Sequence, residues 1–167
     1  MTDQPSFIAP SDARPDCELC SAAGGLLVVD GGAWRVVRVV DADFPAFYRV
    51  IWQAHVGEWT DLDEPARHEC LRIVALVERV LRNALAPTKI NLASLGNVVP
   101  HLHWHVVARF DWDSHYPQPI WGQRQREVPG GAVARLAREL QALDEAVRAA
   151  LLPPQGGVGN VSGAKHP

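Results

Sequence analysis

Three of the seven histidines, His101, His103 and His105, stand at alternate positions of the sequence. Imidazole side chains can bind metals, act as bases or act as nucleophiles. Successive side chains of a β-strand point to opposite faces, so alternate positions place three imidazoles on one face. An apolar core cannot satisfy six ring nitrogens at low cost, which argues against simple burial of that face. Two kinds of site remain open: a metal site, and a row of groups that bind and attack an anion.

The geometry of a single strand helps to separate these two kinds of site. At about 3.3 Å per residue, the Cα atoms of His101 and His105 lie about 13 Å apart, too far for both rings to reach one tetrahedral zinc ion. At most two neighbouring histidines could share a metal, with further ligands from elsewhere. A row of imidazoles suits an extended phosphate, because one neutral ring can attack phosphorus while its neighbours donate N–H groups to the oxygens. The pattern therefore favours phosphoryl or nucleotidyl chemistry.

Cys17 and Cys20 form a Cys-x-x-Cys pair near the start of the chain. Such a pair is half of a zinc site, a redox pair or two thiols without a special role. A redox pair would open a helix within a βαβ unit, and the surrounding sequence does not predict one. The third cysteine, Cys70, falls within a predicted helix, where packing is the simplest role.

Short strands and two helices are expected around these residues. Apolar, β-branched runs between turn residues predict strands over 26–30, 34–40, 47–52, 89–93 and 99–110. Capping residues at 60–65 begin a helix that Pro87 ends, and a second helix is expected over 132–152. The apolar faces of the two helices are Leu71, Val74, Val77, Leu81 and Leu85, and then Val133, Leu136, Leu140, Leu143 and Val147. This order predicts an α+β fold, a five-stranded antiparallel sheet with one main helix and a C-terminal helix.

Length and composition favour a single globular domain. A chain of 167 residues, 47% of them hydrophobic, is neither multidomain nor wholly disordered. The net charge of −3 lacks the basic surplus that long nucleic acid requires, whereas a small nucleotide needs only a local pocket. No apolar run is long enough for a membrane span, and residues 1–10 show neither the basic start nor the apolar stretch of a signal peptide, so we expect a cytoplasmic protein. The expected organisation is a flexible arm over 1–16, a domain over 17–152 and a flexible tail over 153–167.

Residues 91–107, NLASLGNVVPHLHWHVV, resemble the signature of the histidine-triad (HIT) superfamily, in which His-φ-His-φ-His-φ-φ follows an upstream asparagine. The resemblance extends from about Cys17 to about Trp121. It implies an antiparallel five-stranded fold that commonly forms a homodimer. It also implies a nucleotide hydrolase or nucleotidyl transferase that acts at the α-phosphate of a small nucleotide and requires no cofactor for its chemistry.

The resemblance implies catalytic roles for four residues. His103, the middle histidine, would attack the α-phosphorus and form a covalent nucleotidyl-histidine, from which water releases the monophosphate. His101 and His105 would hold the phosphate oxygens and the leaving group. Asn91 would lie beside the phosphate.

It also implies nucleotide-binding and metal-binding sets. Asp41 would accept hydrogen bonds from the ribose hydroxyls, and Asn91, Asn97 and His55 would lie close to the bound nucleotide. Some members of the superfamily bind zinc through a cysteine pair and two histidines. The corresponding ligands here are Cys17, Cys20, His55 and His101, a set that suits tetrahedral zinc. A structural zinc ion is therefore the one candidate cofactor.

Departures from the family pattern keep alternatives open. Asn97 stands where glutamine is usual, and Val98 stands where many members have a Ser or Thr hydroxyl that helps the leaving group. Candidate substrates are dinucleoside polyphosphates, nucleoside phosphoramidates and adenylylated small molecules. The missing hydroxyl motivates a second hypothesis, a non-catalytic nucleotide-binding or interaction protein on the same fold. A metal-dependent enzyme that uses the histidine strand is a third.

Overall fold

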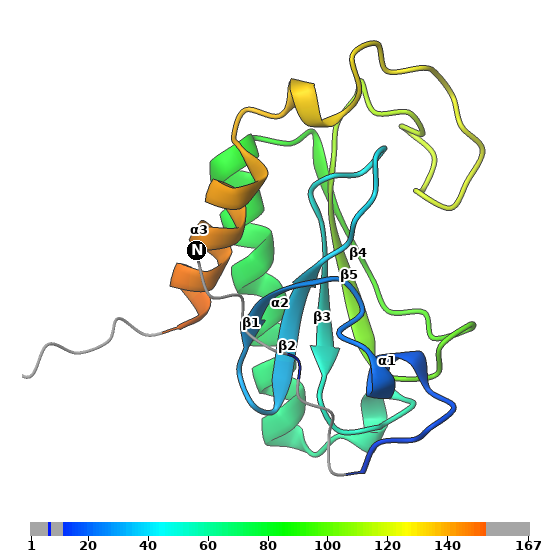
Figure 1. The fold of residues 1–167 in the computed structure, drawn as a ribbon, viewed down its shortest axis with the longest axis vertical. Coiled ribbons are helices and arrows are strands. Elements are labelled where there is room, and N and C mark those ends of the chain that lie inside the picture. The colour runs from blue at the N-terminus through cyan, green and yellow to red at the C-terminus, as the bar shows by residue number, and fades with distance from the viewer. Residues whose placement is uncertain (1–6, 8–11, 153–167) are drawn as a thin grey trace, which may run out of the picture.

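The computed structural model describes residue 7 and residues 12–152, which form one sheet with helices (Figure 1). The elements in chain order are α1 (Glu18–Ser21), β1 (Leu26–Asp30), β2 (Trp34–Arg38), β3 (Phe47–Trp52), α2 (Glu64–Leu85), β4 (Lys89–Ala93), β5 (His103–Arg109) and α3 (Leu140–Leu151), with 3-10 turns at Trp59–Asp61 and Val133–Arg135. The tail predicted over 153–167 and most of the arm lie outside the described residues. The carboxylate of Asp12 accepts a hydrogen bond from the His55 backbone N–H, so the chain contacts the domain before Cys17.

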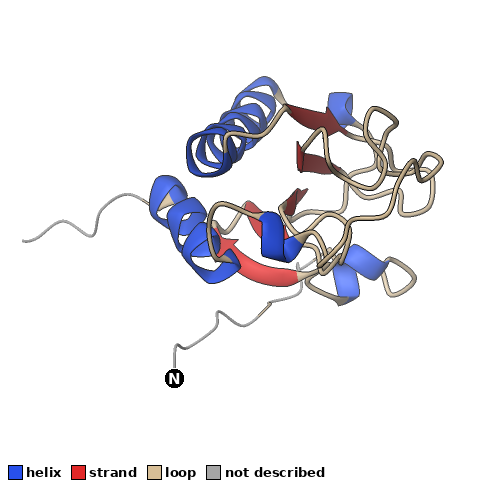
Figure 2. Ribbon diagram, turned by 90° about the horizontal axis from the view of Figure 1, so that it is seen from above, coloured by secondary structure: helices blue, strands red, loops and turns tan. Residues whose placement is uncertain are grey.

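The five strands form an antiparallel sheet in the order β1-β2-β3-β5-β4. Helices α2 and α3 pack on one face, as Figure 2 shows from above. This back face is apolar because the strands alternate, with Val36, Val50 and Val106 buried against the helices. The opposite, front face carries His103 and His105. The expected α+β fold is thereby confirmed.

Helix α2 follows the sequence signals closely. The Asp63 side chain accepts a hydrogen bond from the Ala66 N–H at 2.9 Å and caps the helix, which ends before Ala86 in a left-handed conformation. The buried stripe includes Val74, Val77, Leu81 and Leu85 as predicted. Leu71 is a correction, since it is 44% exposed. In the described part of the chain, no helix combines the length and apolarity needed to cross a membrane.

Three predicted boundaries were wrong, each at a loop. Strand β2 ends at Arg38 rather than 40. Strand β5 begins at His103 rather than 99, because residues 94–102 form the loop that joins β4 to its neighbour β5. Helix α3 begins at Leu140 instead of 132. Val133 has helical spacing but is 52% exposed, and the backbone is extended at Leu136. Apolar spacing therefore did not locate the start of this helix.

Arg35 fixes α1 to the front face of the sheet. The side chain is fully buried, and its Nη2 donates to the carbonyls of Leu19 and Ala22 at 2.6 and 3.3 Å. Its Nε donates to the Ala23 carbonyl at 3.0 Å and its Nη1 to Gln53 Oε1 at 2.7 Å. The carbonyls at the end of α1 are thus satisfied by one guanidinium, which holds the short helix in place.

We expect Arg35→Met to lower the free energy of unfolding by about 3 kcal/mol, because it leaves buried carbonyls without donors. Urea denaturation measures this loss, and hydrogen exchange should show faster exchange within residues 17–24. Arg79→Met, on the exposed surface of α2, is the matched control. Equal stabilities for the two variants would contradict the assigned role of Arg35.

Candidate functional site

His103 is the first residue of β5, and its ring lies on the front face beside that of His105, with the ring centroids 4.7 Å apart. The Nδ1 atom of His103 lies 2.7 Å from the backbone carbonyl oxygen of His101. A carbonyl can only accept, so Nδ1 carries the hydrogen and Nε2 keeps its lone pair. Burial lowers the pKa of His103, which favours this neutral form. The ring is thus set up as a nucleophile or a base at Nε2.

His105 is buried among aromatic rings. Its ring centroid lies 5.3 Å from that of Phe47 and 5.1 Å from that of Trp121. Burial, with smaller contributions from His103 and Arg49, lowers the pKa of His105 to about 3. Within the described chain its Nδ1 atom is buried without a hydrogen-bond partner. His105 is therefore neutral near pH 7 and has one nitrogen that the protein does not satisfy.

Two cavities meet at His105 and Trp121. The first, which we call the His103 cavity, has a volume of about 460 Å³ and is lined by His103, His105, Arg49, by Glu18 of α1 and by Val98 of the 94–102 loop. The second, the Asn91 cavity, measures about 600 Å³ and is lined by β4 and by residues 117–121. Both volumes lie in the range of small-molecule sites, about 300–1,000 Å³. Gly96, with φ of +80°, makes the turn that the 94–102 loop needs.

A buried ion pair orients Asn91 toward the second cavity. Arg109 Nε and Nη2 donate to the Asp113 carboxylate at 2.7 and 3.0 Å, and both side chains are 2% exposed. Arg109 Nη1 donates to Asn91 Oδ1 at 2.7 Å, and Nη2 also donates to the Gln118 carbonyl at 2.8 Å. The Asn91 oxygen is therefore engaged, which leaves its NH₂ group as the donor for a ligand.

Sequence reasoning missed Asp113, which lies in a stretch that shows no regular pattern. Its carboxylate also accepts from the backbone N–H groups of Phe110, His115 and Tyr116. An acid whose side chain can cap the N–H groups two and three residues later is a turn signal that could have pointed to it. This one side chain folds the loop that carries Trp121 toward His105.

Asp113→Asn is expected to lower the free energy of unfolding by about 3–5 kcal/mol, because it leaves the Arg109 charge buried without its partner. Burial opposes ionisation of Asp113, but the hydrogen bonds from Arg109 and the backbone outweigh it and hold its pKa below the usual value. The stabilisation is therefore present above pH of about 4 and is lost as pH falls through the folded-state pKa. Urea titrations of both proteins from pH 7 to pH 3 measure this. Asp111→Asn, at an exposed position, is the control, and an equal loss in that variant would contradict the prediction.

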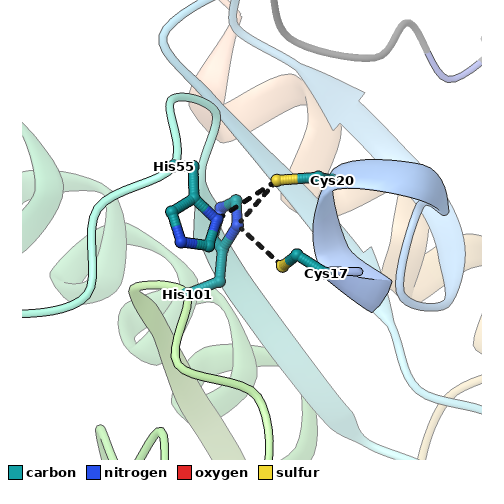
Figure 3. A group of neighbouring side chains, drawn as sticks. All are labelled: Cys17, Cys20, His55 and His101. Atoms are coloured by element: carbon teal, nitrogen blue, oxygen red, sulfur yellow. Dashed lines mark hydrogen bonds between the residues drawn. The ribbon is translucent and has the colours of Figure 1, made fainter. Parts of the chain in front are cut away.

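Cys17, Cys20, His55 and His101 form a cluster between α1, the loop after β3 and the loop before β5 (Figure 3). The Nδ1 atom of His101 lies 3.5 Å from each sulfur, and the Nδ1 atom of His55 lies 3.3 Å from Cys20 Sγ. All four ligand atoms lie within 4.8 Å of one another, and both cysteines are free thiols. In a tetrahedral zinc site, bonds of about 2.3 and 2.0–2.1 Å place sulfur and nitrogen about 3.5 Å apart. The cluster could therefore hold such a metal ion.

The position of His101 differs from the expectation that its ring grips phosphate oxygens. His101 is fully buried, and its Nε2 donates to the Trp52 carbonyl at 2.7 Å while its Nδ1 faces the two sulfurs. Neither nitrogen reaches the His103 cavity. The reason is that β5 starts only at His103, so His101 lies outside the strand and its side chain turns toward α1. His101 contributes its backbone carbonyl to the site, by orienting His103.

The remaining predicted residues, Asn97, His55 and Asp41, lie in three different parts of the structure. Asn97 is exposed and lines the His103 cavity. His55 belongs to the cysteine cluster. Asp41 lies in the loop after β2, where its Oδ1 accepts from the N–H groups of Asp43 and Phe44 at 2.8 and 3.0 Å. Asp41 lines neither cavity, so its contact with ribose stays a prediction.

The fold and the site together define a class of protein. It is an α+β domain with helices on the back face of an antiparallel sheet, and its front face presents a neutral imidazole to a small-molecule cavity. The family model of the HIT domain matches residues 26–112, about half of the chain, and the protein belongs to the HIT family. A histidine triad protein from Bradyrhizobium japonicum is 29% identical with a TM-score of 0.61, over 75% of this chain and 90% of that chain.

Two further crystal structures support the fold. A histidine triad protein from Sinorhizobium meliloti is 24% identical with a TM-score of 0.60, over 75% of this chain and 88% of that chain. One from Marinobacter aquaeolei is 22% identical with a TM-score of 0.61, over 77% and 90% of the two chains. A comparison with curated proteins gives no match. The family and fold predicted from the residues are thereby confirmed.

Proposed function

We propose that the protein is a nucleotide hydrolase or nucleotidyl transferase that acts at an α-phosphate through a covalent intermediate on His103. The observation that carries this proposal is the hydrogen bond of 2.7 Å from His103 Nδ1 to the His101 carbonyl, which leaves Nε2 unprotonated. That ring lines a cavity of about 460 Å³. A neutral, oriented imidazole in a cavity of ligand size is the arrangement that nucleophilic catalysis requires.

The reaction would proceed in two displacements at the same phosphorus. The Nε2 lone pair of His103 forms a bond to the α-phosphorus, and the bond from phosphorus to the leaving group breaks, so the leaving group takes its electron pair. The imidazolium that results is stabilised by the His101 carbonyl. Water, or another acceptor in the transferase, then attacks phosphorus, the P–N electron pair returns to Nε2 and the acceptor's proton goes to solvent. The product of hydrolysis is a nucleoside monophosphate.

The other site residues would position the substrate. His105 and the NH₂ group of Asn91 would contact phosphate oxygens or the leaving group, Asn97 would contact the nucleotide from the loop, and Asp41 would hold the ribose. Val98 is 92% exposed at the cavity wall and offers no hydroxyl to protonate a leaving group. The site therefore favours leaving groups that depart as stable anions, such as the polyphosphate arm of a dinucleoside polyphosphate, over phosphoramidates, whose amine must be protonated.

We also propose that Cys17, Cys20, His55 and His101 hold a structural zinc ion. When bound, zinc would supply folding free energy and neutralise the two thiolates, with no part in the displacement. The hydrogen bond from His101 Nε2 to the Trp52 carbonyl supports this proposal, because it directs the Nδ1 lone pair toward the sulfurs. A homodimer and a cytoplasmic location remain predictions.

A hydrolysis panel tests the proposed function. Purified protein is given a dinucleoside polyphosphate, a nucleoside phosphoramidate and an adenylylated small molecule, and the release of nucleoside monophosphate is measured. We expect turnover with the polyphosphate to be fastest. Tight binding of a nucleoside monophosphate without turnover of any substrate would reject the enzyme and favour the non-catalytic nucleotide-binding protein. In protein whose Cys17, Cys20, His55 and His101 cluster is already loaded with zinc, activity that still requires a further added metal would favour the metal-dependent enzyme instead.

A further inference from the structure

Arg49 lies at the centre of the front face. No role was predicted for this residue from the sequence. It lies in the middle of β3 and is directly opposite His105 in the register with β5. Residues in that relation have Cβ atoms about 4.5–5.5 Å apart. The side chain is half-buried and lines the His103 cavity together with His103 and His105.

The guanidinium of Arg49 is only partly satisfied by the protein. Its Nη1 donates to the Gly24 carbonyl at 3.2 Å, and its carbon lies 5.7 Å from the centroid of the Phe47 ring. Its Nε atom is buried without a hydrogen-bond partner in the part of the chain that the structure describes, and it forms no ion pair there. A guanidinium offers five N–H groups, so most of its donor capacity is left for a ligand.

Two arginines on the same face, Arg35 and Arg109, are buried and show what a structural arginine looks like in this protein. Arg35 donates four hydrogen bonds to the protein, to three carbonyls and one side-chain amide. Arg109 makes a two-pronged pair with Asp113 and also reaches Asn91 and Gln118. Arg49 has neither an acid partner nor a set of carbonyls. Its environment is complete only with an added acceptor.

Charge gives a second reason. Among the described residues that line the His103 cavity, Arg49 is the only arginine or lysine and Glu18 is the only acid. Displacement at an α-phosphate builds negative charge on the phosphoryl oxygens, and a fixed cation beside those oxygens stabilises that charge. Without Arg49, no arginine or lysine among the described residues would line this cavity.

We propose that Arg49 binds the phosphoryl oxygens of the substrate in the His103 cavity and is a catalytic residue of the reaction. This inference rests on the proposed function and identifies the cavity as a site for an anionic, phosphorylated ligand. The same guanidinium could instead contact a pair of acceptors on a nucleobase, such as those of guanine. The charge argument favours the phosphate.

Equilibrium binding of AMP and of adenosine separates phosphate recognition from a structural role. Isothermal titration is done on the metal-loaded protein, on Arg49→Met, on Arg49→Lys and on the surface control Arg79→Met. We expect the wild type and the control to bind AMP at least about tenfold more tightly than adenosine, as charge-assisted hydrogen bonds predict. Arg49→Met loses this preference and keeps its adenosine affinity. Arg49→Lys falls between, because a lysine restores the charge without the planar fork.

Three results would overturn the assignment of Arg49: an unchanged preference in Arg49→Met, an equal loss of both ligands, or a wild type that binds AMP no better than adenosine. A further titration compares GMP with AMP, and a loss of affinity confined to GMP would assign Arg49 to the base instead.

Turnover of the polyphosphate distinguishes this proposal from the proposed function. If Arg49→Met loses the AMP preference while the wild type hydrolyses nothing, only the enzyme is rejected. If turnover and AMP preference survive in Arg49→Met, only the role of Arg49 is rejected.

Discussion

Replacing His103 by alanine is expected to lower kcat for nucleotide hydrolysis by about 10⁴-fold or more, because the variant removes the atom that forms the bond to phosphorus. The His101 carbonyl orients the ring of His103, whereas the Nδ1 atom of the neighbouring His105 has no hydrogen-bond partner in the described chain, so His105 is not held in the same way. Rapid acid-free quenching with a nucleotide labelled at the α-phosphate should trap a labelled protein in the wild type and none in His103→Ala. Nucleoside monophosphate binding should survive, since the cavity walls remain.

Two further variants make this prediction specific. His68→Ala replaces an exposed histidine of α2 and should leave both kcat and the trapped label unchanged. His105→Ala keeps the nucleophile and should lower kcat by a smaller factor, about 10²–10³-fold, as the loss of one oxyanion donor does in other enzymes. A kcat for His103→Ala within tenfold of the wild type would exclude covalent catalysis by this ring.

Removal of one ligand from the cluster of Cys17, Cys20, His55 and His101 should strongly lower the stability of the protein. Cys20 is fully buried with its sulfur 3.3 Å from His55 Nδ1 and 3.5 Å from His101 Nδ1, so Cys20→Ala removes a ligand that contacts both histidines. We expect one equivalent of zinc in the purified wild type and none in the variant. The free energy of unfolding should fall by at least about 4 kcal/mol, the value for a ligand present at a thousand times its Kd. Metal analysis and urea denaturation, each with and without a chelator, measure these changes.

Cys70→Ala is the matched control for the metal prediction. Cys70 is buried in α2 among the residues behind the sheet, apart from the cluster, so this variant should keep its zinc and lose only a little packing. The cluster also fixes His101, whose carbonyl orients His103, so the chelated protein should lose turnover along with stability. Folded wild type that contains no metal, and whose unfolding a chelator does not change, would rule out the zinc site.

Much of the fold and part of the site follow from local patterns. The period of two in a strand places His103 and His105 on the face opposite Val106 and Ala108, because successive side chains of a strand point to opposite faces. The capping side chain of Asp63 and the apolar spacing behind it are enough to locate α2. These features depend on residues within a few positions of one another, so the chain alone specifies them.

Other features depend on contacts between distant segments, which local patterns do not encode. The ring of His101 leaves the row and faces Cys17 and Cys20, which lie 84 and 81 positions earlier in the chain. Asp113 is only four positions from Arg109, but Arg109 also contacts Asn91, 18 positions away, and this contact forms only when β4 lies beside β5. Arg49 reads as one charged residue in a strand, and its unsatisfied guanidinium is apparent only once β3 lies beside β5 and the cavity has formed. Burial removes water as an alternative partner, so the packed fold determines which polar groups remain available to a substrate.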